Sequence, residues 1–235
     1  MSKQHEVLLV DAGNSNVKSS FLSGDEFLLQ ADPLRDMALL QSTQRVILAS
    51  VRSPSYSEQL QYECHSKGIE FTEIFTDRAA FGTRCAYQNF KTLGVDRWMM
   101  ILAAARQDEQ ALLVVSIGTA MTVDLIHEKQ HKGGWITPGF DMSKSALFSN
   151  TQQVFGNNDY PGENLFGSST EHCVNFGCRA QVNGLIYEAI NIAEQFAEKV
   201  KVLVCGGGVS LLDKEKFSNI EVDENLIFKG MKRFI

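Results

Sequence analysis

Two short polar turns, each directly after a buried apolar strand, are the residues best suited to phosphate chemistry. The first is Asp11-Ala-Gly-Asn14, which follows the apolar residues 7–10. A carboxylate at the end of a buried strand can hold Mg²⁺ through its water shell, and Gly13 lets backbone N–H groups approach phosphate oxygens. Asn14 adds a hydrogen-bond donor and Lys18 a positive charge. The alternative is a plain hairpin turn capped by Asp and Asn.

The second turn, Ser116-Ile-Gly118-Thr119, follows the apolar residues 111–117. If the two turns face each other, both can bind the same phosphates. Asp124 comes next, on a predicted returning strand, and an acidic side chain deep in a cleft usually needs a cation. Asp124 is therefore a candidate metal ligand, and a solvated position on an edge strand is the alternative.

A third candidate is Leu93-Gly-Val-Asp96-Arg97. Asp96 is expected to begin a helix, whose dipole favours the ionised carboxylate, so that it can accept a proton from an alcohol. Arg97 offers a bidentate grip on a carboxylate or a phosphate. The simpler interpretation is a carboxylate at a helix N-terminus beside an exposed arginine.

The fourth candidate, Gly206-Gly207-Gly208, follows a short apolar strand. It can form a flat backbone platform for a nucleotide base or ribose, or it is a flexible turn. No lysine-serine or lysine-threonine pair follows, so it is not a Walker P-loop. It also lies too near the C-terminus to begin the βαβ unit of a dinucleotide-binding fold.

These residues need a scaffold of strands and helices to position them. Strands are predicted at 7–10, 17–21, 27–29, 46–51, 69–75, 111–117, 122–126, 134–137 and 202–205, and helices at 54–67, 96–106, 171–200 and 224–235. Residues 8–19 and 114–125 share one pattern of buried strand, polar residue, glycine turn and returning strand. The pattern predicts two similar halves with a hinge near 107–110; two unrelated hairpins are the alternative.

Composition narrows the class of protein. With 235 residues, the chain is long enough for one large or two small domains. Its net charge of -6 gives no global field that would attract nucleic acid or an anionic membrane. The five cysteines are odd in number and lack zinc-finger spacing, which favours reduced thiols. No segment resembles a signal peptide or a membrane span, so a soluble, cytoplasmic protein is expected.

Taken together and in order, the motifs resemble those of type III pantothenate kinases. The matching segments are DAGNSNVK (11–18), LGVDR (93–97), SIGTAMTVD (116–124), GGWITPG (133–139), GSST (167–170) and CGGG (205–208). This family belongs to the superfamily of acetate and sugar kinases, actin and heat-shock chaperones, whose duplicated halves enclose ATP. The resemblance implies an α/β, duplicated ribonuclease H-like (actin/hexokinase-like) two-lobe fold. Its lobes would span 1–109 and 110–235, the second including the terminal helix.

The resemblance also implies how pantothenate would be bound. Asp96 would act as the general base on its primary hydroxyl. Gly94 and Arg97 would hold the substrate, with Tyr87 lining its pocket. Thr170 would contact pantothenate bound to the partner subunit, so a homodimer is implied.

The remaining implied roles concern ATP and cations. Asp11 would organise Mg²⁺ and the phosphates, and Asp124 would coordinate a monovalent cation, K⁺ or NH₄⁺. The other residues expected at ATP are Gly13, Asn14, Lys18, Gly118, Thr119, Gly206 and Gly207. The carboxylates of Asp11, Asp96 and Asp124 are expected to converge in one crevice between the lobes.

The reaction implied is ATP + pantothenate → ADP + 4′-phosphopantothenate, the first step of coenzyme A biosynthesis. Phe90 and Trp98 depart from the family pattern near the expected pantothenate pocket. One alternative is a non-catalytic regulatory protein of the same fold, like accessory transcription factors, although the three intact carboxylates argue against it. Another is an enzyme of this fold that acts on a different small alcohol or acid.

Overall fold

The computed structural model describes residues 7–105, 111–151, 166–213, 215–217 and 220–235, so the predicted hinge at 107–110 lies outside the described residues. The chain divides into two compact units. The first comprises Met1–Phe81, Tyr87–Ala103 and Asn225–Ile235, and the second Gly82–Ala86 and Ala104–Glu224. The C-terminal segment therefore groups with the first unit, whereas the sequence placed it in the second lobe.

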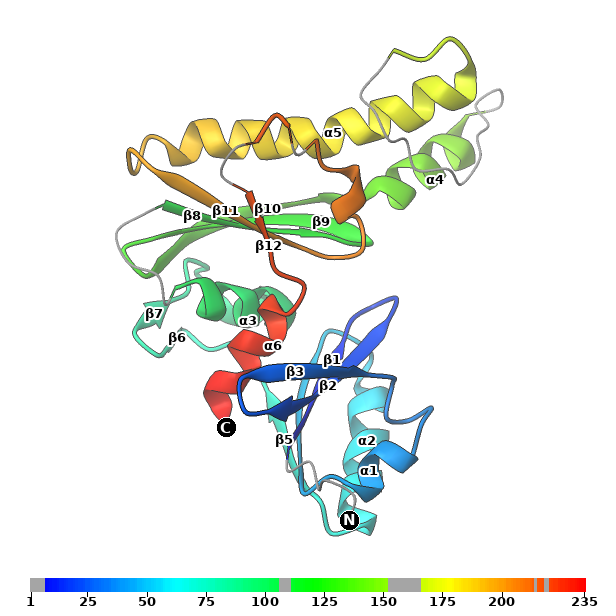
Figure 1. The fold of residues 1–235 in the computed structure, drawn as a ribbon, viewed down its shortest axis with the longest axis vertical. Coiled ribbons are helices and arrows are strands. Elements are labelled where there is room, and N and C mark those ends of the chain that lie inside the picture. The colour runs from blue at the N-terminus through cyan, green and yellow to red at the C-terminus, as the bar shows by residue number, and fades with distance from the viewer. Residues whose placement is uncertain (1–6, 106–110, 152–165, 214, 218–219) are drawn as a thin grey trace. The chain divides into compact units, whose positions relative to one another are not determined.

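The first unit is built on a five-stranded sheet of order β3-β2-β1-β4-β5. Its strands are β1 (Val7–Ala12), β2 (Val17–Ser23), β3 (Glu26–Gln30), β4 (Arg45–Ser50) and β5 (Glu70–Ile74). The central strand of the hairpins, β2, pairs antiparallel with both β1 and β3, and β4 pairs parallel with both β1 and β5. Helices α1 (Ala38–Gln41) and α2 (Pro54–Ser66) share a hydrophobic core with β1 and β4 (Figure 1).

The second unit repeats this topology. Its sheet has the order β10-β9-β8-β11-β12. The strands are β8 (Ala111–Ile117), β9 (Ala120–His127), β10 (Gln130–Pro138), β11 (Val200–Cys205) and β12 (Ile220–Val222). The strands β8, β9 and β10 pair antiparallel, and β8, β11 and β12 pair parallel, as in the first unit. The duplication predicted from the two glycine turns is therefore confirmed by strand order and direction.

One face of the second sheet is covered by α4 (Phe140–Asn150) and α5 (Thr170–Ala193) (Figure 1). The sequence did not predict α4, and it extended the following helix to residue 200. The structure ends α5 at Ala193, before β11 begins. Gly177 and Gly184 lie within α5, which is one continuous helix.

The C-terminal segment is fixed to the first unit by close backbone packing. It forms α6 (Leu226–Met231) and the 3₁₀ turn η3 (Lys232–Phe234), shorter than the single helix predicted over 224–235. A Cβ on Gly230 would lie 1.9 Å from the carbonyl oxygen of Met99, which belongs to α3 (Val95–Ala104). Only glycine allows this approach, which explains why the segment belongs to this unit.

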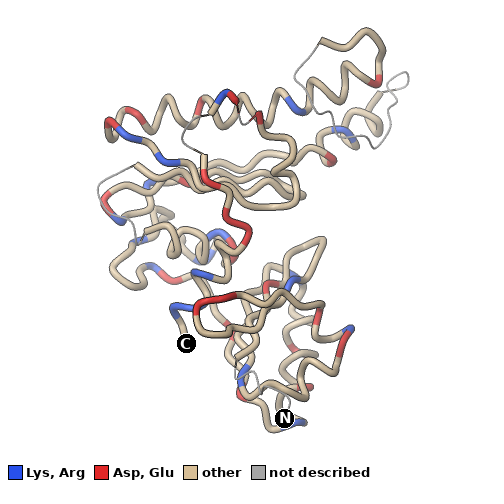
Figure 2. Tube along the Cα trace, viewed as in Figure 1, with Lys and Arg blue, Asp and Glu red and all other residues tan. Residues whose placement is uncertain are grey.

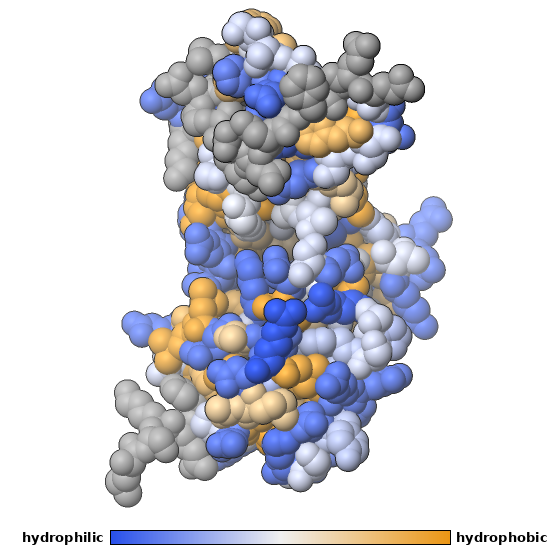
Figure 3. Space-filling model, turned by 90° about the vertical axis from the view of Figure 1, so that its right-hand side faces the viewer, coloured by the Kyte–Doolittle hydropathy of each residue, from blue (hydrophilic) through white to orange (hydrophobic). Residues whose placement is uncertain are grey.

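The remaining elements are short. They are β6 (Ala79–Ala80), β7 (Thr83–Arg84), η1 (Phe90–Thr92) and η2 (Val209–Leu211). Acidic and basic residues are interspersed along both units (Figure 2), and hydrophilic residues surround small hydrophobic patches on the face drawn in Figure 3. Among the described residues, no helix combines the length and hydropathy that crossing a membrane would need.

Candidate active site

The first of the two turns predicted to bind phosphate, Asp11-Ala-Gly-Asn14, connects β1 to β2. It is called the first phosphate turn below. Asp11 pairs with Lys18 across these strands, so the predicted carboxylate and cation are neighbours. Asn14 is exposed in the turn between them. A Cβ on Gly13 would meet the carbonyl oxygen of Asn16 at 3.1 Å, which favours glycine in so tight a turn. The four predicted residues of this motif therefore lie together.

The carboxyl group of Asp11 has an unusually high pKa. Burial is the main cause that raises its pKa to about 7, and the charge on Asp96 raises it further, while Lys18 lowers it. Burial penalises the charged form, and a nearby negative charge does the same. A divalent cation would offset both penalties, so the surroundings of Asp11 fit a Mg²⁺ ligand.

Asp96 lies in the first turn of α3, as the sequence predicted. Its Oδ1 accepts a hydrogen bond from the backbone N–H of Arg97 at 2.8 Å. A Cβ on Gly94 would lie 2.4 Å from this same oxygen. The glycine of the LGVDR motif therefore leaves the space that the Asp96 carboxylate occupies.

Arg97 and Tyr87 are in direct contact. The guanidinium Nη1 of Arg97 donates to the Tyr87 hydroxyl at 3.0 Å, and its carbon lies 5.8 Å from the centre of the ring. Arg97 is buried, not exposed, which makes it a positioned cation.

Trp98 is fully buried on α3 and is therefore part of the core. The guanidinium of Arg78 lies over the ring of Phe90, with its carbon 5.2 Å from the centre of that ring.

A pocket of about 480 Å³ lies next to this motif within the first unit. The ends of β4 and β5 and the segment before α3 line it: Ser50, Val51, Phe75, Thr76, Lys91, Thr92, Leu93, Gly94 and Val95. It has room for a small organic molecule. Lys91 adds a positive charge to its wall.

Two glycines, Gly139 and Gly206, pack closely against the backbone of the second turn, which lies between β8 and β9. A Cβ on Gly139 would lie 2.0 Å from the carbonyl oxygen of Gly118, and the Gly139 N–H donates to the Thr119 carbonyl oxygen at 3.0 Å. Gly206 has a φ of +99°, and a Cβ there would lie 2.4 Å from the Ile117 oxygen. Gly118 and Thr119 themselves remain exposed.

The three consecutive glycines at positions 206–208 differ in their surroundings, a difference that the sequence did not show. Gly206 and Gly208 let the chain approach Ile117, and the Gly208 N–H donates to the Ile117 carbonyl oxygen at 2.9 Å. Gly207 has no heavy atom within 4 Å of the position of a Cβ. Of the three, Gly207 is the residue whose surface is open to a ligand.

Asp124 is completely buried on β9. Its Oδ1 lies 3.0 Å from Nε2 of His131, which is also buried. A solvated position on an edge strand, the alternative interpretation, is wrong, because β9 lies between β8 and β10. A buried carboxylate is a suitable oxygen ligand for a cation.

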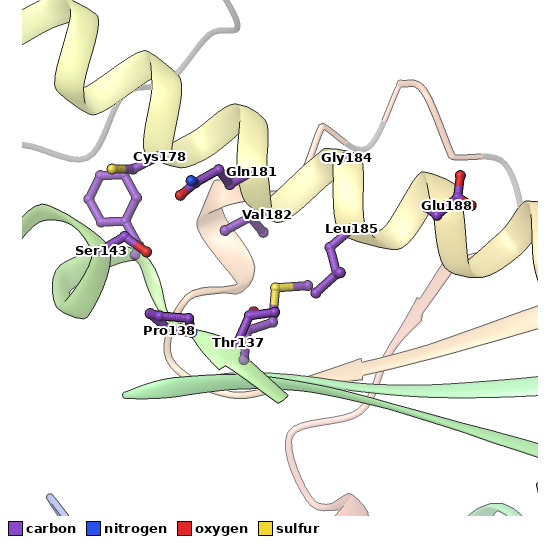
Figure 4. Close-up of a pocket in the computed structure, with 11 residues that line it drawn as sticks. Thr137, Pro138, Ser143, Cys178, Gln181, Val182, Gly184, Leu185 and Glu188 are labelled. Atoms are coloured by element: carbon purple, nitrogen blue, oxygen red, sulfur yellow. The ribbon is translucent and has the colours of Figure 1, made fainter. Parts of the chain in front are cut away.

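Thr170 is exposed at the first position of α5 and lines a pocket of about 660 Å³ with Gly167, Ser168 and Cys173 among others. None of the residues of the glycine turns lines this pocket. A further pocket of about 520 Å³ lies between β10, α4 and α5 (Figure 4). Its walls are mostly apolar and contain none of the predicted site residues.

Sequence reasoning missed two residues. Nη2 of Arg52 donates to the Asn14 carbonyl oxygen at 3.1 Å, so this cation holds the first phosphate turn. A signal was present, since Arg52 follows a buried strand at the end where ligands bind in α/β sheets. His131, the partner of Asp124, gives no such signal, because its role depends on the pairing of β9 and β10.

The predicted site residues divide between the two units. The first unit holds Asp11, Gly13, Asn14, Lys18, Tyr87, Gly94, Asp96 and Arg97. The second holds Gly118, Thr119, Asp124, Thr170, Gly206 and Gly207. Interactions within the first unit join Asp11 to Asp96 and Tyr87 to Arg97. Convergence of Asp124 with the other two carboxylates stays a prediction.

Two sheets of equal strand order, each with a glycine turn after its first strand, define the duplicated fold of the sugar kinase and actin class. A solved structure described as a 2-dehydro-3-deoxygalactonokinase from Sinorhizobium meliloti has this fold, with a TM-score of 0.59 and 10% identity, and 97% of each chain is covered. The ethanolamine utilization protein EutJ from Carboxydothermus hydrogenoformans has a TM-score of 0.51 and 13% identity, covering 97% of this chain and 89% of its own.

The chain belongs to the type III pantothenate kinase family, whose model matches residues 7–192. A type III pantothenate kinase from Pseudoalteromonas atlantica is 35% identical, over 100% of this chain and 99% of its own. Another from Pseudoalteromonas translucida is 30% identical, over 95% and 94%. A solved Baf family transcriptional activator from Campylobacter jejuni is similar at 25% identity, with a TM-score of 0.62 and 97% and 96% coverage.

Proposed function

We propose that this chain transfers the γ-phosphoryl group of ATP to the primary hydroxyl of pantothenate, giving ADP and 4′-phosphopantothenate for coenzyme A biosynthesis. Membership of the family and the full-length match to its curated members support this reaction. The observation that carries it is the interaction of Asp11 with Asp96. The charge of Asp96 acts on Asp11, so the carboxylate of the phosphate turn and that of the LGVDR motif lie within electrostatic reach of each other.

On the acceptor side, Asp96 orients the hydroxyl of pantothenate and accepts its proton. Phosphoryl transfer depends mostly on positioning and charge stabilisation, so orientation matters as much as basicity. Gly94 keeps space for the Asp96 carboxylate. Arg97, held by Tyr87, is suited to the carboxylate of pantothenate, because a guanidinium binds such a group through two parallel hydrogen bonds.

On the nucleotide side, the two glycine turns offer backbone N–H groups to the phosphates. Gly13, Asn14 and Lys18 contribute from the first unit, and Gly118 and Thr119 from the second. Gly206 and Gly207 accommodate the adenosine, and the open surface of Gly207 supports this assignment.

Two cations complete the proposed site. Asp11 binds Mg²⁺, which neutralises phosphate charge during transfer. Asp124 binds a monovalent cation, K⁺ or NH₄⁺, which offsets the charge of this buried carboxylate. The raised pKa of Asp11 and the complete burial of Asp124 support these roles.

We also propose a cytoplasmic homodimer in which Thr170 reaches the pantothenate of the partner subunit. Large apolar side chains are exposed on α4 and α5, which offers a surface for a second copy. They are Met142, Leu147 and Tyr187. The net charge of -6 favours neither nucleic acid nor an anionic membrane as a partner.

An assay of ADP release with pantothenate, with and without K⁺, tests the function. Release that depends on pantothenate supports the proposal. Release with a different alcohol only would assign another kinase substrate. No release with any acceptor would favour a regulatory protein, the alternative that the likeness to the Baf family activator raises.

A further inference from the structure

We propose that His131 is a positioning residue for the monovalent-cation site, and that it links Asp124 to the segment preceding Tyr87. This inference rests on the proposed role of Asp124 as the cation ligand. Every contact that carries it lies within the second unit.

A β-bulge places His131 on the same face of the sheet as Asp124. Side chains alternate along β9, and Val123 belongs to the core under α5, so Asp124 points to the opposite face. His131 pairs with Ile126 and Gly133 with Leu125, so Lys132 is the extra residue between them. Without this insertion, Lys132 would take the position opposite Ile126.

Two glycines make this geometry possible. Gly133 has a φ of +129°, a conformation that residues with a side chain rarely adopt. Gly134 is the residue opposite Asp124 on β10. Since Gly134 has no side chain, the imidazole of His131 can lie diagonally across it and reach the carboxylate.

The tautomer of His131 follows from its two hydrogen bonds. The backbone N–H of Ala86 donates to Nδ1 at 3.3 Å, so this nitrogen carries no proton. The proton of the neutral ring is then on Nε2, which donates to Oδ1 of Asp124 at 3.0 Å. A donor in this position orients the carboxylate oxygen, as the group behind a metal ligand commonly does.

The residue before His131 binds the same segment. Oε1 of Gln130 accepts from the Arg84 N–H at 3.0 Å, and its Nε2 donates to the Gly82 carbonyl oxygen at 3.0 Å. Gln130 and His131 thus hold Gly82–Ala86 against β10 through three hydrogen bonds. Tyr87 follows this segment directly in the chain. His131 therefore contacts both Asp124 and the segment that leads directly into Tyr87.

The alternative is a buried pair that serves stability alone. Thermal unfolding of the full chain in KCl and in choline chloride, at equal ionic strength, separates the two. Specific K⁺ binding raises the Tm of the wild-type protein in KCl by mass action. If the role of His131 were purely structural, replacing it would lower the Tm equally in both salts. The K⁺-dependent shift in Tm would then stay unchanged.

His131→Leu should weaken K⁺ binding, measured from the K⁺ dependence of Tm, by at least about tenfold, the usual effect of removing a group that orients a metal ligand. His131→Gln should recover part of this loss, because its amide N–H₂ can donate near the position of Nε2. His127→Gln is the matched control, since His127 lies on β9 and packs edge-to-face on Phe196. It should leave the K⁺ shift unchanged.

An unaltered K⁺ shift in His131→Leu would overturn the inference and leave the cation assignment of Asp124 intact. A wild-type protein whose Tm does not respond to K⁺ would instead overturn that assignment. The ¹⁵N NMR signals of the His131 ring provide a test that needs no cation. A proton on Nε2 supports the inference, and a proton on Nδ1 refutes it.

Discussion

Asp96 raises the pKa of Asp11, so two carboxylates from separate motifs act on each other within one unit of the protein. Asp11 ends a buried strand and Asp96 begins a helix. Their mutual repulsion is unfavourable without a cation, and a bound Mg²⁺ would relieve it. In the proposed function, the same pair links metal binding to the position of the acceptor hydroxyl.

Replacing Asp96 by asparagine tests the proposed general base. Asp96→Asn should lower kcat by about 10²- to 10⁴-fold, the usual contribution of a positioned base. The Tm and the affinity for ATP should stay close to wild type, because the carboxamide has the same size and its oxygen can still accept from the Arg97 N–H. Steady-state kinetics and a thermal shift with ATP measure both.

Asp77→Asn serves as the matched control, because Asp77 is exposed and lies outside the motif. It should keep full activity. Near-normal turnover of Asp96→Asn would refute the role of Asp96, whereas loss of activity through unfolding would appear as a lowered Tm.

Asp11→Asn should change how the stability of the metal-free protein depends on pH. The pKa of Asp11 is raised from 3.8 to about 7, so the folded state holds a proton that the unfolded state has lost between these values. The wild-type contribution to stability therefore falls as pH rises from 4 to 7. Relative to wild type, the variant should gain at most about 3 kcal/mol between pH 5 and pH 8.

Urea unfolding in EDTA at both pH values measures this difference. Added Mg²⁺ and ATP should reverse the order, stabilising the wild type more than Asp11→Asn. A difference between the two proteins that does not vary with pH would show that Asp11 is already ionised in the folded protein at pH 5.

The sequence was sufficient to predict the duplicated halves and most strands, because continuous apolar runs followed by glycine turns identify buried strands locally. It also placed Asp96 correctly in the first turn of α3. The role of His131 was not predictable, since it depends on a bulge that moves one residue to the opposite face. Nor was the assignment of the C-terminal segment, which depends on the contact of Gly230 with Met99.

Tyr87→Phe tests whether Tyr87 orients Arg97 for the substrate. The change removes one hydrogen bond at 3.0 Å and keeps the ring near the guanidinium. A bond of this kind contributes about 1 kcal/mol, so the KM for pantothenate should rise about three- to tenfold with a smaller change in kcat. An equal rise in the KM for ATP would contradict this assignment.

Gly206→Ala and Gly207→Ala separate packing from ligand contact in the triple glycine. Alanine at 206 would take a positive φ and clash with the Ile117 oxygen, so we expect a loss of at least about 2 kcal/mol in unfolding free energy. Alanine at 207 meets open space and should leave the Tm nearly unchanged while raising the KM for ATP. An unchanged KM for ATP in Gly207→Ala would remove this residue from the nucleotide site.

Arg52→Ala tests whether the arginine after β4 holds the first phosphate turn in place. Losing its hydrogen bond to the Asn14 carbonyl oxygen should loosen the turn and remove a positive charge beside the phosphates. Because Arg52 is only half-buried, we expect a loss of about 1 kcal/mol, or about fivefold in the KM for ATP. Arg45→Ala, at the opposite end of β4, controls for the loss of an arginine from this strand and should leave the KM for ATP unchanged. If both variants alter the KM for ATP alike, the effect belongs to the stability of the sheet and the assigned role of Arg52 is wrong.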